Sequence, residues 1–133
     1  MTKGDLHQYI WIKKNIDKLE EKLLEIETKA TKITPTLSDE IKSGDNFDKI
    51  PRLICDMVKV QEDINNELQK LYAKQREIES SIKGLDEREK YLVRARYLEG
   101  KCWEEIAVDM GYSWRQIHNI HSDTLKKLHT FAQ

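Results

Sequence analysis

The sequence predicts an all-α protein: a long antiparallel helical hairpin, built as a coiled coil, followed by a C-terminal helix-turn-helix domain. Two stripes of apolar residues at alternating steps of three and four predict the helices of the hairpin. Only 5 Gly and 2 Pro occur among 133 residues, so long helices meet few interruptions. We expect the hairpin over residues 1–83 and the second domain over residues 84–133.

The first stripe predicts a helix over about residues 5–32. Its members follow one another at steps of 3, 4, 3, 4, 3, 4 and 3: Tyr9, Ile12, Ile16, Leu19, Leu23, Ile26, Ala30 and Ile33. An unbroken heptad pattern of this kind places all members on one face of a helix. The residues between them are mostly charged, as in KLEEKLLEIETK, and suit the solvated faces.

The second stripe predicts a helix over about residues 48–83, again at steps of three and four. Nine of its eleven members are apolar: Ile50, Ile54, Met57, Gln61, Ile64, Leu68, Leu71, Gln75, Ile78, Ile82 and Leu85. Gln61 and Gln75 are the exceptions, and polar residues inside a seam tend to fix register or partner.

The segment between the stripes contains Pro35 and Gly44, which favour the end of one helix and a reversal of the chain. We therefore expect the two helices to pack against each other; the alternative is that each stripe pairs with a second molecule. Further apolar residues lie off the second stripe and could bind another helix or a second subunit: Leu53, Val58, Val60 and Tyr72. A homo-oligomer formed through the hairpin is therefore a candidate assembly.

Start and stop signals divide the C-terminal part into three helices. Gly84 interrupts the long helix, and Asp86 with Glu89 three residues later forms a capping box for a restart. Ser113 and Gln116 form a second such pair. The predicted helices run from this restart to about residue 98, over residues 103–110 and over about residues 114–128.

The last two of these helices have the spacing of a helix-turn-helix. Ala107 is small where the helices would cross, and Gly111 lies where the turn needs a residue comfortable at positive φ. Apolar residues expected to fix the crossing and continue its buried face are Ile106, Met110, Ile117, Ile120, Leu125 and Leu128.

The stretch LDEREKYLVRARYLEGKCWEEIAVDMGYSWRQIHNIHSDTLKKL resembles region 4 of the sigma-70 family over about 44 residues. The matching positions are Leu85, Arg88, Glu89, Arg94, Arg96, Tyr97, the run Glu105-Ile106-Ala107, Gly111, Leu125, Lys127 and Leu128. Three positions depart from the family: Cys102 replaces the usual capping Ser or Thr, and Trp114 and His118 stand where primary sigma factors place charged residues. The resemblance implies the docking mode on double-stranded DNA and leaves the promoter sequence open.

The whole chain is also similar to small regulators of phages and prophages of Gram-positive bacteria, of the RinA and ArpU types. The heptad-rich N-terminus, the phrase ATKITPTLSDEI and the segment WEEIAVDMGYSWRQIHNIH carry this likeness. It implies a cytoplasmic regulator in a bacterial host that switches on late viral genes, with host RNA polymerase as a candidate partner.

The N-terminal half of the second helix of a helix-turn-helix faces the major groove. The outward residues there are the predicted DNA contacts: Ser113, Trp114, Arg115, His118, Asn119 and Ser122. Arg115 can bridge O6 and N7 of guanine, and Asn119 can pair with N6 and N7 of adenine. Trp114 is expected to meet a thymine methyl, a sugar or another protein if it is exposed; the alternative is that it packs on the hairpin.

Lys101, just before the first helix of the motif, is a candidate phosphate contact. Further candidates are Arg88, Arg94 and Arg96, although one of them could pair internally with Glu89 or Glu99. His121 is expected on the surface or in domain packing. The net charge of −1, with eight basic and eight acidic residues over positions 85–133, excludes a protein that coats nucleic acid along its whole surface.

Other function classes find little support. No catalytic arrangement of side chains can be assembled, so we expect neither an enzyme nor a cofactor. His118 and His121 with Cys102 lack a fourth ligand, so no metal is expected. No apolar run reaches the roughly 20 residues of a membrane span. Two rival functions stay open: a DNA-recognition subunit of a packaging complex, and an adaptor that binds RNA polymerase without reading DNA.

Overall fold

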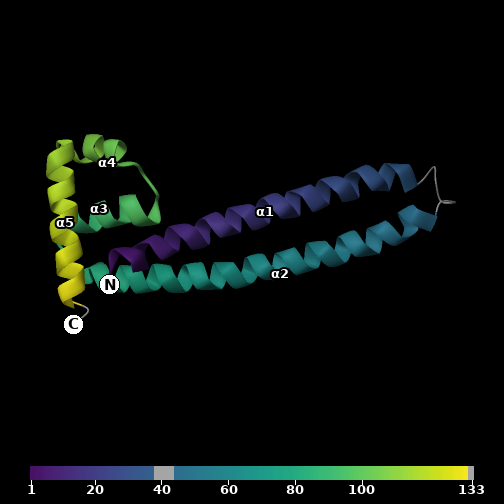
Figure 1. Ribbon diagram of the computed structural model, residues 1–133, viewed down its shortest axis with the longest axis horizontal. Coiled ribbons are helices and arrows are strands. Elements are labelled where there is room, and N and C mark those ends of the chain that lie inside the picture. The colour runs from purple at the N-terminus through teal and green to yellow at the C-terminus, as the bar shows by residue number, and fades with distance from the viewer. Residues whose placement is uncertain (38–43, 132–133) are drawn as a thin grey trace. The chain divides into compact units, whose positions relative to one another are not determined.

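The computed structural model describes the backbone of residues 1–37 and 44–131, and the side chains of residues 1–32 and 49–131. Every regular element in these ranges is helical and none is a strand, which confirms the all-α fold class (Figure 1). The elements in chain order are α1 (Lys3–Leu37), α2 (Gly44–Ser81), a short 3-10 turn η1 (Ile82–Gly84), α3 (Glu87–Val93), a π-helical turn η2 (Arg94–Leu98), α4 (Trp103–Met110) and α5 (Trp114–Phe131).

The chain folds into two compact units. One consists of residues 14–69, and the other combines residues 1–13 with residues 70–133. The N-terminal end of α1 and the C-terminal end of α2 therefore belong to the same unit as the C-terminal helices. The domain boundary between residues 83 and 84, which the sequence suggests, therefore stays a prediction.

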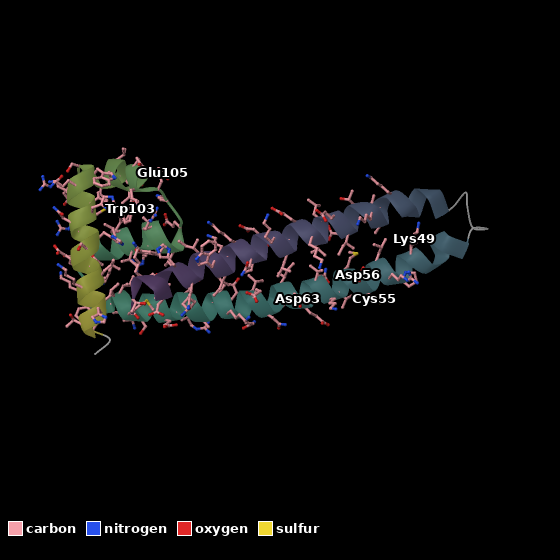
Figure 2. The ribbon with its side chains drawn as sticks, viewed as in Figure 1. Lys49, Cys55, Asp56, Asp63, Trp103 and Glu105 are labelled. Carbon is pink, nitrogen blue, oxygen red and sulfur yellow. The ribbon has the colours of Figure 1, made fainter. Side chains whose placement is uncertain are left out.

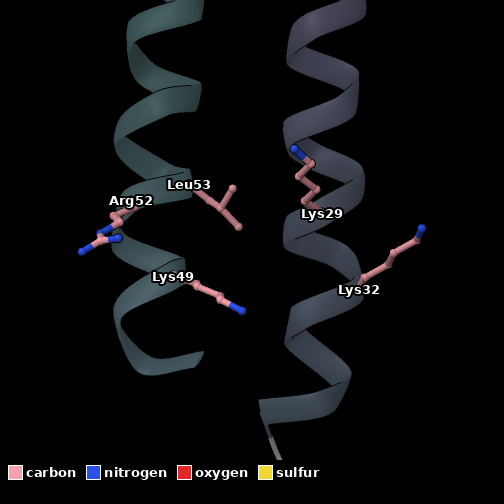
Figure 3. A pocket seen from close by; sticks show the side chains of 5 residues that line it. All are labelled: Lys29, Lys32, Lys49, Arg52 and Leu53. Atoms are coloured by element: carbon pink, nitrogen blue, oxygen red, sulfur yellow. The ribbon is translucent and has the colours of Figure 1, made fainter. Parts of the chain in front are cut away.

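Residues 14–69 form a helical hairpin in which α1 and α2 run side by side in opposite directions (Figure 1). Both helices are longer than predicted, because they continue into the segment that contains Pro35 and Gly44. The stripe of α1 is confirmed from Tyr9 to Ala30, since each of these members is buried or half-buried. The side chain of Ile33 lies outside the described residues. Toward the connection a cavity of about 490 Å³ opens between the helices, lined by Lys29, Lys32, Lys49, Arg52 and Leu53 (Figure 3).

The predicted stripe of α2 is wrong at two positions, Ile54 and Gln61, and its other members are buried or half-buried. Ile54 and Gln61 are exposed, whereas Val60 is 3% exposed and Leu53 is half-buried. The face that turns inward contains Ile50, Leu53, Met57, Val60, Ile64, Leu68 and Leu71. This register buries Val60 in place of Gln61, which avoids the free-energy cost of removing an amide from water. Gln61 therefore does not set the register of the hairpin, while Gln75 is half-buried.

Both predicted capping boxes are present. The backbone N–H of Glu89 donates to Asp86 Oδ1 at 2.8 Å, and the N–H of Asp86 donates to Glu89 Oε1 at 3.4 Å, which begins α3. Gly111, at φ +70°, ends α4 as expected, since its left-handed conformation suits a glycine. The predicted bounds of α4 are confirmed.

A small apolar core holds α4 against α5. Leu92, Ala95, Ile106 and Ile117 are buried in it. The residues packed around them are Trp103, Ala107, Met110, Tyr112 and Ile120. This core fixes the direction in which α5 presents its outer face, because two helices that share buried side chains cannot rotate independently.

The chain between α3 and α4 contains a feature that the sequence analysis missed. Residues Arg94–Leu98 form a π-helical turn, in which the N–H of Glu99 donates to the carbonyl of Arg94 at 2.9 Å. Ala95 and Tyr97, two residues apart within this turn, are both buried.

Candidate nucleic-acid interface

The outer face of α5 carries most of the predicted DNA contacts. Its exposed members are Ser113, just before the helix, and Trp114, Arg115, Asn119 and Ser122. The opposite face is buried and consists of Ile117, His121, Thr124 and Leu128. Arg115, Asn119 and Ser122 follow one another at steps of four and three, so they lie along one side of the helix.

Ser113 begins α5 through the second capping box. Its Oγ accepts a hydrogen bond from the N–H of Gln116 at 3.2 Å, and its own N–H donates to Gln116 Oε1 at 2.8 Å. These bonds satisfy two of the free donors at the start of the helix. The hydroxyl proton of Ser113 remains available for a phosphate oxygen.

Trp114 lies exposed at the start of α5, with 59% of its surface open to solvent. Its ring stacks at a tilt on His118, with 3.9 Å between the centroids. The ring centroid of His118 in turn lies 4.8 Å from that of Trp103. Trp103 begins α4 and is labelled in Figure 2. His118 is therefore held between two indole rings. Its Nε2 is covered and has no hydrogen-bond partner among the described residues, so it reaches DNA only if one of those rings moves.

Arg96 completes this aromatic stack on its inner side. Its guanidinium lies 4.5 Å from the ring of Trp103, and its Nη1 donates to the backbone carbonyl of Lys101 at 3.1 Å. A cation over an indole face is attracted by the ring quadrupole. Arg96 thus supports the start of α4, and it does so without the internal acid partner that the sequence suggested as an alternative.

Lys101 is held by acidic neighbours. Its Nζ lies 3.2 Å from Asp109 Oδ2 and 3.4 Å from Glu99 Oε2. Hydrogen bonds to Asp109 and Glu99 raise the pKa of Lys101 above its ordinary value. A phosphate contact through Lys101 must therefore compete with two carboxylates.

The other predicted phosphate contacts also have partners. Arg94 forms a bidentate ion pair with Glu79 of α2, in which Nε donates to Oε1 at 3.0 Å and Nη2 donates to Oε2 at 2.7 Å. Arg88 donates to the hydroxyl of Tyr112 at 3.5 Å. Arg115 differs from them, because within the described part of the chain it forms no ion pair and no hydrogen bond. It is the arginine of this face that can bind without first leaving a partner.

A buried polar cluster supports α5 from behind. The hydroxyl of Tyr97 and Nε2 of His121 are joined by a hydrogen bond whose donor depends on the imidazole tautomer, and the two rings stack with 5.8 Å between centroids. Burial raises the pKa of Tyr97 to about 12 and, as the largest of several causes, lowers the pKa of His121 to about 4. The phenol therefore stays protonated and the imidazole neutral, as this hydrogen bond requires. His121 belongs to the packing between elements, which is one of the two places expected for it.

A second buried contact ties α5 to the start of α3. Glu89 is 2% exposed and accepts hydrogen bonds from Thr124 Oγ1 at 3.2 Å and from Lys127 Nζ at 2.8 Å. A buried carboxylate needs such donors, since burying an unpaired charge is costly. Tyr97, Glu89 and Thr124 were not predicted to position the reading helix. The capping-box pattern in the sequence predicts only one partner of the Glu89 carboxylate, the N–H of Asp86. It does not predict the contacts with Thr124 and Lys127.

The described residues hold no group of three or more histidine, cysteine or acidic side chains arranged for a metal ion, so Cys102, His118 and His121 do not converge. Among the described helices, none combines the length and the apolar character that a membrane span requires.

Comparison with known proteins gives one family for the C-terminal part. Searches of curated proteins and of solved structures returned no match. Residues 81–130 match the family described as Sigma-70, region 4, and this range contains α3, η2, α4 and all of α5 except its last residue. This part of the chain is thus similar to region 4 of sigma-70 factors and carries a helix-turn-helix of that kind.

Proposed function

We propose that this protein is a DNA-binding transcription regulator that places α5 in the major groove of promoter DNA. The observation that carries the proposal is the pair of faces on α5. Arg115, Asn119 and Ser122 are exposed and do not pack in the core. The inward face, in contrast, is held by the core and by the buried contacts of His121 and Thr124. The similarity of residues 81–130 to sigma-70 region 4 supports the same docking mode.

Arg115 and Asn119 are proposed to read bases. They lie one helical turn apart, and each carries the fork of donors or of donor and acceptor that a base edge requires. Ser113 and Ser122 are proposed to bind phosphate or a base edge through their hydroxyls. Trp114, being exposed and apolar, suits contact with a thymine methyl or a sugar.

Lys101 and His118 are also proposed to contact DNA, but each of them can do so only after a local rearrangement. Lys101 binds a phosphate when the phosphate replaces Asp109 or Glu99 as its partner. His118 binds through Nε2 when Trp114 moves aside. These two contacts are therefore expected to contribute less affinity than Arg115 and Asn119.

The finer part of the proposal is that the regulator acts on late phage genes, in the bacterial cytoplasm, together with host RNA polymerase. The likeness of the whole chain to RinA- and ArpU-type regulators supports the phage role. The similarity to a region of a polymerase subunit supports the polymerase partner.

One feature of α4 favours a second candidate, the adaptor that binds polymerase. Val108 is 81% exposed and lies one turn from Glu104, with Glu105 and Asp109 also exposed. An acidic surface around an apolar side chain repels DNA phosphates and suits a basic, apolar protein partner. On this candidate the same domain would grip polymerase through α4.

Binding to selected DNA tests the proposal. A pool of random duplexes is enriched on the full-length protein, and affinities for the selected duplex are measured by fluorescence anisotropy over a salt series. Arg115→Ala or Asn119→Ala should each weaken binding by roughly 5- to 150-fold, as expected for loss of a two-pronged base contact. Arg52→Ala is the matched control, because Arg52 is exposed on α2, outside the helix-turn-helix. Failure to enrich any sequence, or wild-type binding by both α5 variants, would favour the adaptor.

A further inference from the structure

A second heptad stripe runs along α2, next to the one that packs on α1. Its members follow at steps of 4, 3, 4, 3 and 4: Ile54, Val58, Gln61, Asn65, Leu68 and Tyr72. Leu68 is half-buried and belongs to both stripes, because it lies at the edge of the face that turns toward α1. Ile54 is 54% exposed, and Val58 and Tyr72 are each 48% exposed. None of the six is charged, in a chain in which 35% of residues are. Exposed apolar residues are ordinary when scattered, but an uncharged heptad stripe is the pattern of a helix that meets another helix.

The stripe is complementary to itself when two copies of α2 run in opposite directions. A two-fold axis level with residue 63 places Ile54 opposite Tyr72, Val58 opposite Leu68 and Gln61 opposite Asn65 of the second copy. Apolar side chains then meet apolar ones, and the two amides can exchange hydrogen bonds in the middle. A shift by one heptad would place Ile54 against Asn65 and Val58 against Gln61, which leaves both amides against aliphatic groups.

We propose that the protein forms a homodimer in which α2 of one copy packs antiparallel on α2 of the other along this stripe. The same patch serves both copies, as a two-fold interface requires. The buried amide pairs select this register, since polar groups in a seam discriminate against alternatives in which they stay unpaired. The assembly is independent of the proposed reading of DNA.

One charge at the rim opposes the dimer. Glu62 is exposed and neighbours the stripe near its centre, so the carboxylates of the two copies come to face each other. Salt screens such a repulsion. Association should therefore strengthen with ionic strength, and Glu62→Gln should strengthen it at low salt.

Disulfide trapping tests the register. Both natural cysteines are exposed, so Cys55→Ser with Cys102→Ser provides a thiol-free background (Figure 2 shows Cys55). In that background Gln61→Cys and Asn65→Cys are made as two separate proteins. Mild oxidation should give a covalent dimer when the two are mixed, and little when each is oxidised alone. A parallel pair of helices would instead cross-link each protein with itself, and that result, or no cross-link in the mixture, overturns the proposal.

Sedimentation equilibrium tests whether this face of α2 forms the dimer interface. The wild-type chain should have the mass of a dimer at micromolar concentrations. Val58→Glu should raise the dissociation constant by about tenfold or more, since the two-fold axis places two charges in the seam. Leu24→Glu is the control, because Leu24 is an exposed apolar residue of α1 outside the stripe, and it should remain a dimer. Circular dichroism verifies that both variants fold. A single-chain mass for the wild type, a ring of many copies, or a dimer of Val58→Glu as stable as the wild type overturns the proposal.

Discussion

Acidification should destabilise the unit of residues 1–13 and 70–133 through His121. This imidazole is 7% exposed and hydrogen-bonded to the hydroxyl of Tyr97, and its ring centroid lies 4.6 Å from that of Trp103. Burial is the largest cause that lowers its pKa from 6.5 to about 4; the charges of Lys3, His118, Arg96 and His7 act in the same direction. A depressed histidine pKa means that the unfolded chain binds the proton first. The stability due to neutral His121 is thus complete above about pH 6.5 and is lost as the pH falls toward 4.

The two pKa values set the magnitude. Between pH 8 and pH 5 the free energy of unfolding should fall by about 2 kcal/mol through this residue, and by about 3 kcal/mol well below pH 4. Urea unfolding followed by circular dichroism, at both pH values, gives the wild-type loss. The same loss in His121→Gln should be smaller by about 2 kcal/mol, because the amide keeps an acceptor for Tyr97 and does not titrate.

Comparison of the two losses removes the contribution of all other titrating groups, His7 included, whose pKa is also lowered by burial. His129→Gln is the control for the removal of a histidine, since His129 is exposed and the buried cluster stays intact. It should retain the full loss attributed to His121. If His121→Gln and the wild type lose equal stability on acidification, burial of a neutral imidazole does not account for the effect.

Two further predictions concern the helices. Val60→Asp should destabilise the hairpin by several kcal/mol, roughly the cost of an unpaired buried polar or charged group, whereas Lys59→Asp on the exposed side should change thermal melting little; equal melting of the two variants would show that Val60 does not face α1. Gly111→Ala should cost about 1–2 kcal/mol from the left-handed backbone alone, since a Cβ there meets no atom within 4 Å. Gly4→Ala, in the first turn of α1, is its control and should not lower the melting temperature; a neutral Gly111→Ala would show that the turn tolerates a side chain.

Local chemistry made much of this fold predictable. α1 also has apolar residues beside its stripe, such as Trp11 and Leu24, but charged residues lie between them, so only one continuous stripe can be drawn. Capping boxes and Gly111 act over three or four residues, so they fix the bounds of α3, α4 and α5 without any distant contact.

The register of α2 was harder, for a reason visible in its sequence. Apolar residues occur in adjacent pairs, at Leu53 and Ile54 and again at Met57 and Val58, so two stripes can be drawn through the same helix. Only the packing against α1 decides which stripe turns inward. The second one is then left over, and it is the surface assigned here to a second copy.

The ion pairs that the basic side chains form within the protein could not be predicted either. Lys101 and Asp109 are eight residues apart, and Arg94 pairs with Glu79 across two helices. Such pairings depend on tertiary distances, whereas the sequence offered Lys101, Arg88, Arg94 and Arg96 alike as phosphate contacts and suggested only Glu89 or Glu99 as an internal partner for one of the arginines. The π-helical turn could not be predicted either, and Tyr97 within it contacts the rings of His7 and His121, which lie far from it along the chain.

The contacts of Glu89 have a consequence for the evolution and engineering of specificity. Glu89 caps α3 and, through Thr124 and Lys127, anchors the far half of α5, so the helix is secured from its inward side and its C-terminal end. Positions 115, 119 and 122 contribute nothing to that anchorage. They can therefore be exchanged for other side chains as a set, and on the proposed function the domain is a scaffold that can be retargeted to new operator sequences without being redesigned.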